Sequence, residues 1–313
     1  MTGGNGSPQG ILPAMSRWEV QLLCVALVAI DLVTRTWRIQ WILRGMRFVV
    51  PFGEAFTLNV VGDTASAITP LRIGGEPARI AAMTHAKVPV AGGVVAILIE
   101  ILVMWPVIIA AAGWLALIYA PTWWHESAPA LGDSLRHGWP WFAGVLIFSV
   151  VAWLVSRRLF PRASRSMRRG TRRAWAFARR MPAWPLIASV PVTLVSLAAR
   201  VAILPVLALS LPDPPAMGPL FFASFTLLYS QLVLPTPSGV GAVDLGFLAG
   251  AAGDLGGHHT SMLLIWRFYT TFVPVALGIF LGLQRYGRDA VVALLQGRTH
   301  VSAAPAPPLD DDD

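Results

Sequence analysis

The sequence is poor in charged residues and almost without cysteine. Only 13% of its 313 residues are charged, whereas soluble globular domains carry about 25%. The single cysteine, Cys24, excludes a disulfide framework and a metal site built on several thiolates. Lys87 is the only lysine, so every other basic side chain except histidine is an arginine. These deficits exclude an ordinary soluble domain and a disulfide-stapled one.

Hydrophobic residues, in contrast, make up 55% of the chain and come in long runs. A bilayer-spanning helix needs about 20 consecutive apolar residues. Runs of this kind occur at residues 18–37, 89–120, 138–156, 184–209 and 260–283. We therefore expect an all-α polytopic membrane protein with a single transmembrane domain, residues 17–283. A disordered Gly/Pro-rich segment, residues 1–16, should precede it, and a cytoplasmic tail, residues 284–313, should follow.

Two further apolar stretches, within residues 52–87 and 218–258, are too short for a comfortable span. Each ends in prolines, glycines and charged residues, which break a helix. Non-helical backbone at membrane depth is tolerated only where protein or a water-filled cavity covers it. The pattern predicts two re-entrant hairpins, although a full crossing by either hairpin stays an alternative.

The arginine distribution predicts the orientation. Residues 157–180 hold ten arginines and no acidic residue, and they lie between apolar runs. Such a segment is typical of a cytoplasmic loop that touches anionic lipid headgroups, rather than of a nucleic-acid-binding arm. A second basic patch at residues 38–47 follows the first span. We expect the N-terminus outside and the C-terminus in the cytoplasm.

The two halves of the domain, residues 17–120 and 184–283, resemble each other, with the span 138–156 and the loop 157–180 between them. A shift of 167 residues places Pro70 on Pro237 and Gly74 on Gly241, and a shift of 165 places Arg35 on Arg200. The charge rule gives the halves opposite orientations. An inverted-repeat helical bundle follows, a plan in which substrate sites lie at broken helices near the midplane.

Charged side chains inside apolar segments form the candidate site, because an ion in a bilayer needs a partner, a cavity or a function. The arginine fork matches phosphate oxygens, and glycine turns at residues 73–75 and 239–241 would add backbone N–H groups. The candidate phosphate-binding residues are Arg72, Arg79, Arg200 and Arg267. The acidic residues expected to pair with them, or to bind a cation or proton, are Asp63, Glu76, Glu100 and Asp244.

Two structural alternatives stay open for these charges. Glu100 with Arg267, and Arg72 with Glu76, would then be ion pairs that only hold helices together. Arg72 and Arg79 would otherwise extend to the headgroup level. Asp31 and Arg35, four residues apart on one helix face, are expected to pair with each other.

The sequence gives little support for catalysis. Ser238 lacks the flanking glycines of a nucleophile elbow, and no phosphate-binding loop or metalloprotease helix motif occurs. His258 and His259 are adjacent, which does not make a helical metal pair. We expect no enzyme activity, no metal and no cofactor.

Three motifs carry a resemblance to a known family. The first comprises Pro70, Arg72, Gly74, Gly75, Glu76 and Arg79. The second comprises Pro235, Thr236, Pro237, Ser238, Gly239, Gly241 and Asp244. The third comprises Arg267, Tyr269 and Pro274, and Glu100 lies in the long span. With these motifs the chain resembles the flippase-like transmembrane family typified by the membrane region of lysylphosphatidylglycerol synthase. Ser238 and Asp244 depart from the family's glycine and glutamate, and Ile101 and Met104 replace a charged pair.

The resemblance implies transport of a phosphate-containing lipid across a bacterial or archaeal cytoplasmic membrane. An aminoacylated phosphatidylglycerol and a polyprenyl-phosphate-linked sugar are the candidate substrates. The resemblance adds Tyr269 to the candidate binding residues. It also implies a set of gate or turn residues, which are Pro70, Gly74, Gly75, Pro235, Pro237, Gly239 and Gly241. Since only a short tail follows residue 283, we expect no soluble aminoacyltransferase domain. A small-solute carrier and a non-transporting subunit of a lipid or glycan synthase are the alternatives. The candidate protein partners are a second copy of the chain and a lipid-synthesising enzyme.

Overall fold

The computed structural model describes most of both halves. It covers residues 16–69, 72–119, 181–212, 215–230 and 258–295, together with Trp175, Phe177 and Arg179. Every regular element in these residues is helical, as expected for an all-α protein. Several predictions fall outside the described residues: the N-terminal segment up to residue 15, the span 138–156, nearly all of the loop 157–180, and the second hairpin's turn with Pro235, Pro237, Gly239, Gly241 and Asp244. Pro70 and the tail beyond residue 295 are outside them as well.

Four helices in the described part are long and apolar enough to cross a membrane. They are α1 (Arg17–Gly45), α4 (Val90–Tyr119), α7 (Trp184–Ala208), and the run of α10 (His259–Arg267), the π-helical turn η3 (Phe268–Phe272) and α11 (Val273–Leu295). This last run is helical up to a kink at Gly287, where φ is 78°. The first begins at a capping box, in which the Ser16 side chain accepts from the Glu19 N–H and the Glu19 carboxylate accepts from the Ser16 N–H. This helix continues well past residue 37, because Arg38 to Arg44 contain neither proline nor glycine.

Three shorter helices complete the described fold: α2 (Phe52–Ile68), α3 (Gly75–His85) and α8 (Met217–Ser230). The α3 helix folds back on α2, and two glycines allow the close approach. A Cβ atom at Gly62 would collide with the Arg79 side chain, and one at Gly75 would collide with Ser66. The α2–α3 pair is therefore a tightly packed helical hairpin.

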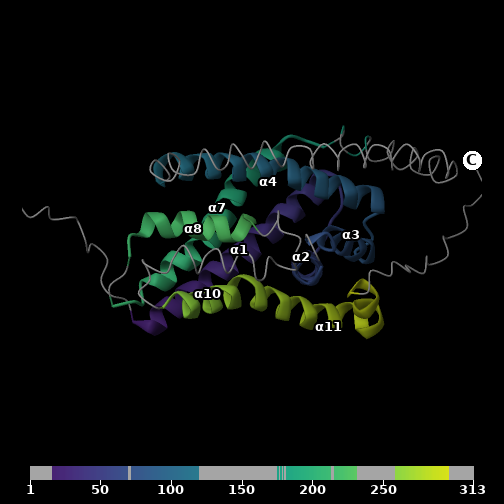
Figure 1. Ribbon diagram of the computed structural model, residues 1–313. Helices are drawn as coiled ribbons and strands as arrows, with labels where there is room; N and C mark the ends of the chain where they lie inside the picture. The colour runs from purple at the N-terminus through teal and green to yellow at the C-terminus, as the bar shows by residue number, and fades with distance from the viewer. Residues whose placement is uncertain are drawn as a thin grey trace, which may run out of the picture.

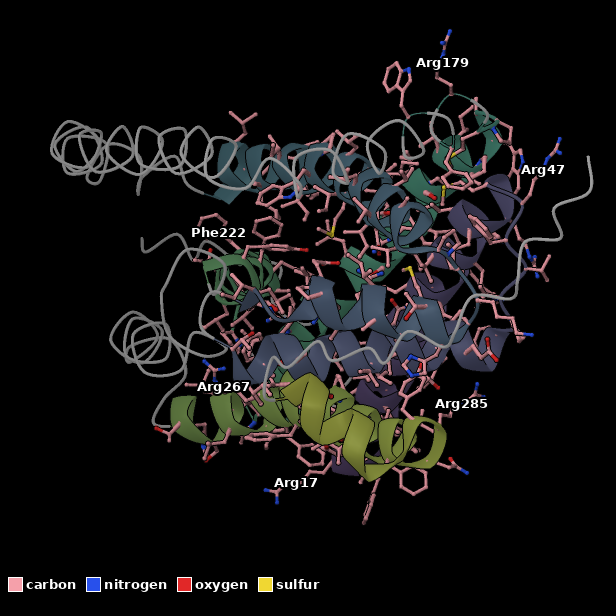
Figure 2. The ribbon with its side chains drawn as sticks, turned by 90° about the vertical axis from the view of Figure 1, so that its right-hand side faces the viewer. Arg17, Arg47, Arg179, Phe222, Arg267 and Arg285 are labelled. Atoms are coloured by element: carbon pink, nitrogen blue, oxygen red, sulfur yellow. The ribbon has the colours of Figure 1, made fainter. Side chains whose placement is uncertain are left out.

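Both ends of this hairpin lie at the same end of the molecule. Phe48, before α2, contacts Gly92 at the start of α4. The ring of His85, at the end of α3, lies 4.9 Å from that of Tyr286 on α11. We call this end the basic end, because it carries the exposed side chains of Arg44, Arg47, Lys87, Arg179 and Arg285. In Figure 2, Arg179 lies at the top right, Arg47 at the right and Arg285 at the lower right.

The helices α1 and α7 cross antiparallel at the centre of the bundle. Gly45, at the end of α1, packs on Pro185 near the start of α7. Further along, Arg38 bonds to Thr193 and Ser196 bonds to Asp31, so residue numbers fall on one helix as they rise on the other. If both helices span a bilayer, they cross it in opposite directions.

The other helices surround this crossing in a regular pattern. In Figure 1, α4 runs along one side of the molecule and α10–α11 along the opposite side. The α2 helix packs on α1 and on α11, while α8 packs on α7 and on α4. The α4 helix also contacts α1, and α10 contacts α7. Apolar side chains from α1, α4, α7, α8 and α10 form one core, and α1, α2, α3 and α4 form a second core toward the basic end.

Candidate functional site

A buried carboxylate on α4 is held by two arginines. Both oxygens of Glu100 accept hydrogen bonds, one from Arg38 of α1 and the other from Arg79 of α3. These three side chains are between 4% and 9% exposed. Arg38 also donates to the Thr193 hydroxyl at 3.1 Å, which adds α7 to the assembly. We call Arg38, Arg79 and Glu100 the sealed cluster.

A second group of charges lies nearer the start of α1, and most of its side chains are more accessible. Arg35 donates to both carboxylate oxygens of Asp63, at 2.8 and 2.7 Å, and lies 3.6 Å from Asp31. Arg200 lies 3.4 Å from Asp31, whose carboxylate also accepts from Ser196 at 2.5 Å. The Arg35, Asp63 and Arg200 side chains are 12%, 14% and 24% exposed. The expected pairing of Asp31 with Arg35 is confirmed.

Arg72 extends this accessible group. Its guanidinium interacts electrostatically with Asp63, Arg35 and Arg200, attracted by the first and repelled by the other two. Its backbone has φ of 57°, a left-handed conformation that is costly for a residue with a side chain, by about 1–3 kcal/mol. The turn thus holds Arg72 in a strained backbone conformation.

We call Asp31, Arg35, Asp63, Arg72 and Arg200 the open cluster. Three guanidinium groups and two carboxylates take part in this cluster, and part of Arg35 and Arg200 stays accessible. Accessible guanidinium groups suit an anionic ligand such as phosphate.

The structure contradicts the two ion pairs that the sequence left open as alternatives. Glu100 binds Arg38 and Arg79, not Arg267, and Glu76 lies 3.3 Å from Arg79 rather than pairing with Arg72. Arg79 does not extend to the headgroup level, because its guanidinium is buried against Glu100. The Gly74 N–H is not offered to an anion either, since it donates to the Thr69 hydroxyl at 2.9 Å.

Sequence reasoning missed Arg38, which it assigned to a cytoplasmic basic patch. The side chain is buried because α1 continues through it to Gly45. A signal was present in the spacing, since Asp31, Arg35 and Arg38 recur at the i, i+4, i+7 positions of one helix face. The α7 helix carries a similar set of polar side chains on one face, namely Thr193, Ser196 and Arg200.

The third motif occupies a different part of the molecule. Arg267 is buried, with its guanidinium carbon 6.0 Å from the ring centroid of Trp266. Tyr269, in the π-helical turn, donates to Gln21 at 2.5 Å. Gln21 precedes Asp31 by ten residues on α1, which is roughly 15 Å along a helix. Of the expected binding residues, Arg72 and Arg200 lie in the accessible group and Arg79 lies in the sealed cluster, whereas Tyr269 lies apart from both.

The π-helical turn has a local cause. Pro274 has no N–H group, so it cannot donate the α-helical hydrogen bond to the carbonyl of Thr270. Turns of this type occur as local irregularities in helices and are frequent at functional sites. Within the described residues, no group of three or more His, Cys, Asp or Glu side chains is placed to hold a metal ion.

A family model described as "Lysylphosphatidylglycerol synthase TM region" matches residues 7–278 of the chain. The chain belongs to this family. The matched part of this lysylphosphatidylglycerol synthase TM region contains both charge clusters, so they are features of the membrane domain itself. The match and the apolar helices together make the chain an integral membrane protein. No curated protein and no solved structure matches it.

Proposed function

We propose that the protein is a flippase-like transporter that moves a phosphate-containing lipid across the cytoplasmic membrane. The open cluster carries this proposal: its guanidinium groups are partly accessible, and it lies where α1 crosses α7. The lipid phosphate would bind Arg72 and Arg200 while the tails stay in the bilayer. An aminoacylated phosphatidylglycerol and a polyprenyl-phosphate-linked sugar both offer this group.

The helix packing supports an inverted repeat. A shift of 165 residues equates α1 with α7, α2 with α8, and α4 with the α10–η3–α11 run. The packing pairs match under this exchange: α1 on α2 corresponds to α7 on α8, and α2 on α11 corresponds to α8 on α4. Asp31 and Ser196, which the shift equates, contact each other directly. Residues meet their own equivalents only near a two-fold axis, so the open cluster would lie at the axis of the repeat.

A lateral groove supports a lipid over a small solute. A cavity of about 1140 Å³ lies between α4, α7 and α8, and its lining is apolar throughout, including Leu102, Ile187 and Phe225. Leu102 and Ile187 are exposed, so within the described residues the cavity opens on the outer surface of the bundle. A lipid can keep its acyl chains in such an opening, whereas a carrier of polar solutes would need a closed, polar passage.

The basic end provides the orientation in this proposal. Arg44, Arg47, Lys87, Arg179 and Arg285 cluster there, and arginine and lysine are enriched on the cytoplasmic side of membranes. The start of α1 then lies outside. The α2–α3 hairpin begins and ends at the basic end, as a re-entrant hairpin entered from the cytoplasm would.

Reconstitution tests the proposal. Purified protein is placed in liposomes containing headgroup-labelled phosphatidylglycerol or a labelled prenyl-phosphate lipid, and the rate at which the label becomes accessible outside is measured. Wild-type protein should accelerate exchange. Arg72→Ala should reduce the rate about tenfold or more, because each hydrogen bond to a charged group contributes roughly 1.5–3 kcal/mol. Arg267→Ala and Glu76→Ala test whether the other two motif residues also contribute.

Arg285→Ala is the matched control, because Arg285 is an exposed arginine at the basic end outside both clusters. It should leave the exchange rate unchanged. If Arg72→Ala is as stable as the wild type and exchanges lipid equally fast, the open cluster does not bind the substrate. If no labelled lipid exchanges but a small anion is taken up, the solute-carrier alternative replaces this proposal.

A further inference from the structure

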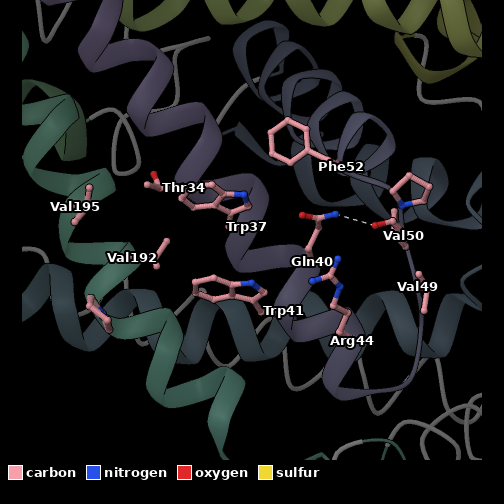
Figure 3. A pocket seen from close by; sticks show the side chains of 12 residues that line it. Thr34, Trp37, Gln40, Trp41, Arg44, Val49, Val50, Phe52, Val192 and Val195 are labelled. Atoms are coloured by element: carbon pink, nitrogen blue, oxygen red, sulfur yellow. Dashed lines mark hydrogen bonds between the residues drawn. The ribbon is translucent and has the colours of Figure 1, made fainter.

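A second cavity, distinct from both charge clusters, lies at the basic end. It has a volume of about 620 Å³ and is formed by the last turns of α1, the loop before α2 and the first half of α7. Figure 3 shows the side chains that line it. They include Trp37, Trp41, Arg44, Phe52, Val192 and Val195. We call this cavity the tryptophan groove.

One face of α1 forms the back of the groove, and the chemistry of its side chains changes from one end of the groove to the other. Thr34, Trp37, Trp41 and Arg44 recur at helical spacing on this face. Thr34 is buried at the inner end, with its hydroxyl bonded to backbone carbonyls of α1. Arg44 is exposed at the outer end, and no described residue engages its side chain by hydrogen bond or ion pair. Along this face, the side chains change from the Thr34 hydroxyl at the inner end, through two indole rings, to the exposed guanidinium of Arg44 at the outer end.

A buried glutamine fixes the wall beside this face of α1. The Gln40 amide donates to the Val50 carbonyl at 2.8 Å, which holds the loop before α2 against α1 (Figure 3). Phe52, just after this loop, lines the groove together with Val192 and Val195 of α7. The shape of the groove is therefore set by side chains that are anchored in the fold.

The groove is apolar and open along its length. Trp37, Phe52 and Val195 are exposed, although their side chains are large and apolar. Exposed apolar side chains next to one basic group suit an amphipathic ligand with an anionic head. Tryptophan is also the residue that accommodates the boundary between headgroups and acyl chains. A phosphate at Arg44 with an acyl chain along the indoles satisfies both parts of the lining.

The inner end of the groove adjoins the charge clusters. Thr34 immediately precedes Arg35 of the open cluster, and Val192 immediately precedes Thr193, the partner of Arg38. Arg44 and Arg35 are nine residues apart on α1, roughly 14 Å along the helix. A lipid headgroup bound at Arg44 would therefore lie at about this distance from the open cluster.

We propose that the tryptophan groove binds a glycerophospholipid from the leaflet at the basic end, with its phosphate on Arg44 and an acyl chain along Trp41, Trp37 and Val195. Its role as the loading site for transport rests on the proposed function. The binding itself does not, because it requires neither a second leaflet nor movement of the lipid.

The test measures binding in detergent with phosphatidylglycerol whose acyl chains carry bromine, which quenches nearby tryptophans. Titration of the wild-type protein should give saturable quenching. Arg44→Gln should weaken the apparent affinity about tenfold, whereas Arg47→Gln, an exposed arginine of the same end that does not line the groove, should not change it. Trp37→Phe combined with Trp41→Phe should remove the saturable component of the quenching.

Val195→Trp provides a variant that keeps every charge and fills the groove. It should weaken lipid binding to a similar extent as Arg44→Gln, while gel filtration shows an unchanged monodisperse peak. Glycerol phosphate, tested in competition, should displace the brominated lipid only at far higher concentration. Displacement at equal concentration would show a site for a free phosphate ester and overturn the lipid assignment.

Equal binding by Arg44→Gln and Arg47→Gln, or saturable quenching that persists without Trp37 and Trp41, overturns the proposal. The two proposals fail separately. Loss of lipid exchange with intact saturable binding contradicts the proposed transport function alone. Normal exchange in a protein whose groove binds no lipid contradicts this inference alone.

Discussion

The sealed cluster and the open cluster both consist of arginine and acidic side chains, but they differ in their access to water. Glu100 in the sealed cluster has a guanidinium on each oxygen, and its surroundings are closed. In the open cluster, Arg35 and Asp63 pair as closely, yet Arg200 and Arg72 add positive charge and part of the surface stays accessible. Exposure, rather than residue type, separates a structural cluster from one that can bind a ligand.

The physical reason lies in desolvation. Removing one partner of a buried ion pair leaves an uncompensated charge, which is strongly destabilising. An accessible pair is partly hydrated, so water can take the place of a lost partner. Substitutions in the sealed cluster should therefore act on stability, and substitutions in the open cluster should act on ligand binding.

Glu100→Gln should have the largest effect on stability. It leaves Arg38 and Arg79 buried without their carboxylate, so the free energy of unfolding should fall by about 3–5 kcal/mol. Equilibrium unfolding in mixed micelles with increasing SDS measures it. Glu76→Gln is the control, because the Glu76 side chain is 48% exposed and its pairing with Arg79 should contribute at most about 1 kcal/mol. Equal losses for the two variants would contradict the sealed cluster.

Arg200→Gln should separate stability from transport. Asp31 keeps its bonds to Ser196 and Arg35, so the free energy of unfolding should fall by only about 1–2 kcal/mol. Lipid exchange in liposomes should nevertheless fall about tenfold, because a phosphate would lose one of its arginines. A loss of stability as large as that of Glu100→Gln, or undiminished exchange, would show that the open cluster is also purely structural.

Thr193→Val and Ser196→Ala should have the smallest effects on stability. Each variant removes one hydroxyl group, the first beside the sealed cluster and the second beside the open cluster. The first removes the acceptor of the Arg38 bond, and the second removes the donor to Asp31. Interhelical bonds of this kind in membranes contribute about 0.5–1 kcal/mol on average. Because Thr193, Ser196 and Asp31 are all buried, we expect losses of similar size in the SDS titration. A markedly smaller loss for Thr193→Val would imply that water reaches Arg38.

The sequence predicted the membrane class, the four long spans that the structure describes and most charged residues of the two clusters, but not Arg38. Apolar runs and the motifs around Arg72 and Glu76 were sufficient, because both signals are local in the chain. The position of the first span was only partly right. Arg38 follows directly on an apolar run and precedes further arginines, so its local context resembles that of a cytoplasmic loop.

The composition by itself determined that this chain belongs in a bilayer, since its apolar runs can be buried nowhere else. Only the tertiary structure decided which charges meet. Glu100 pairs with Arg38, 62 positions away, and Asp31 contacts Ser196, 165 positions away. These choices depend on how each helix is rotated and on the close approach that Gly62 permits between α2 and α3. The same packing determines which arginines are sealed from water and which stay open to a ligand.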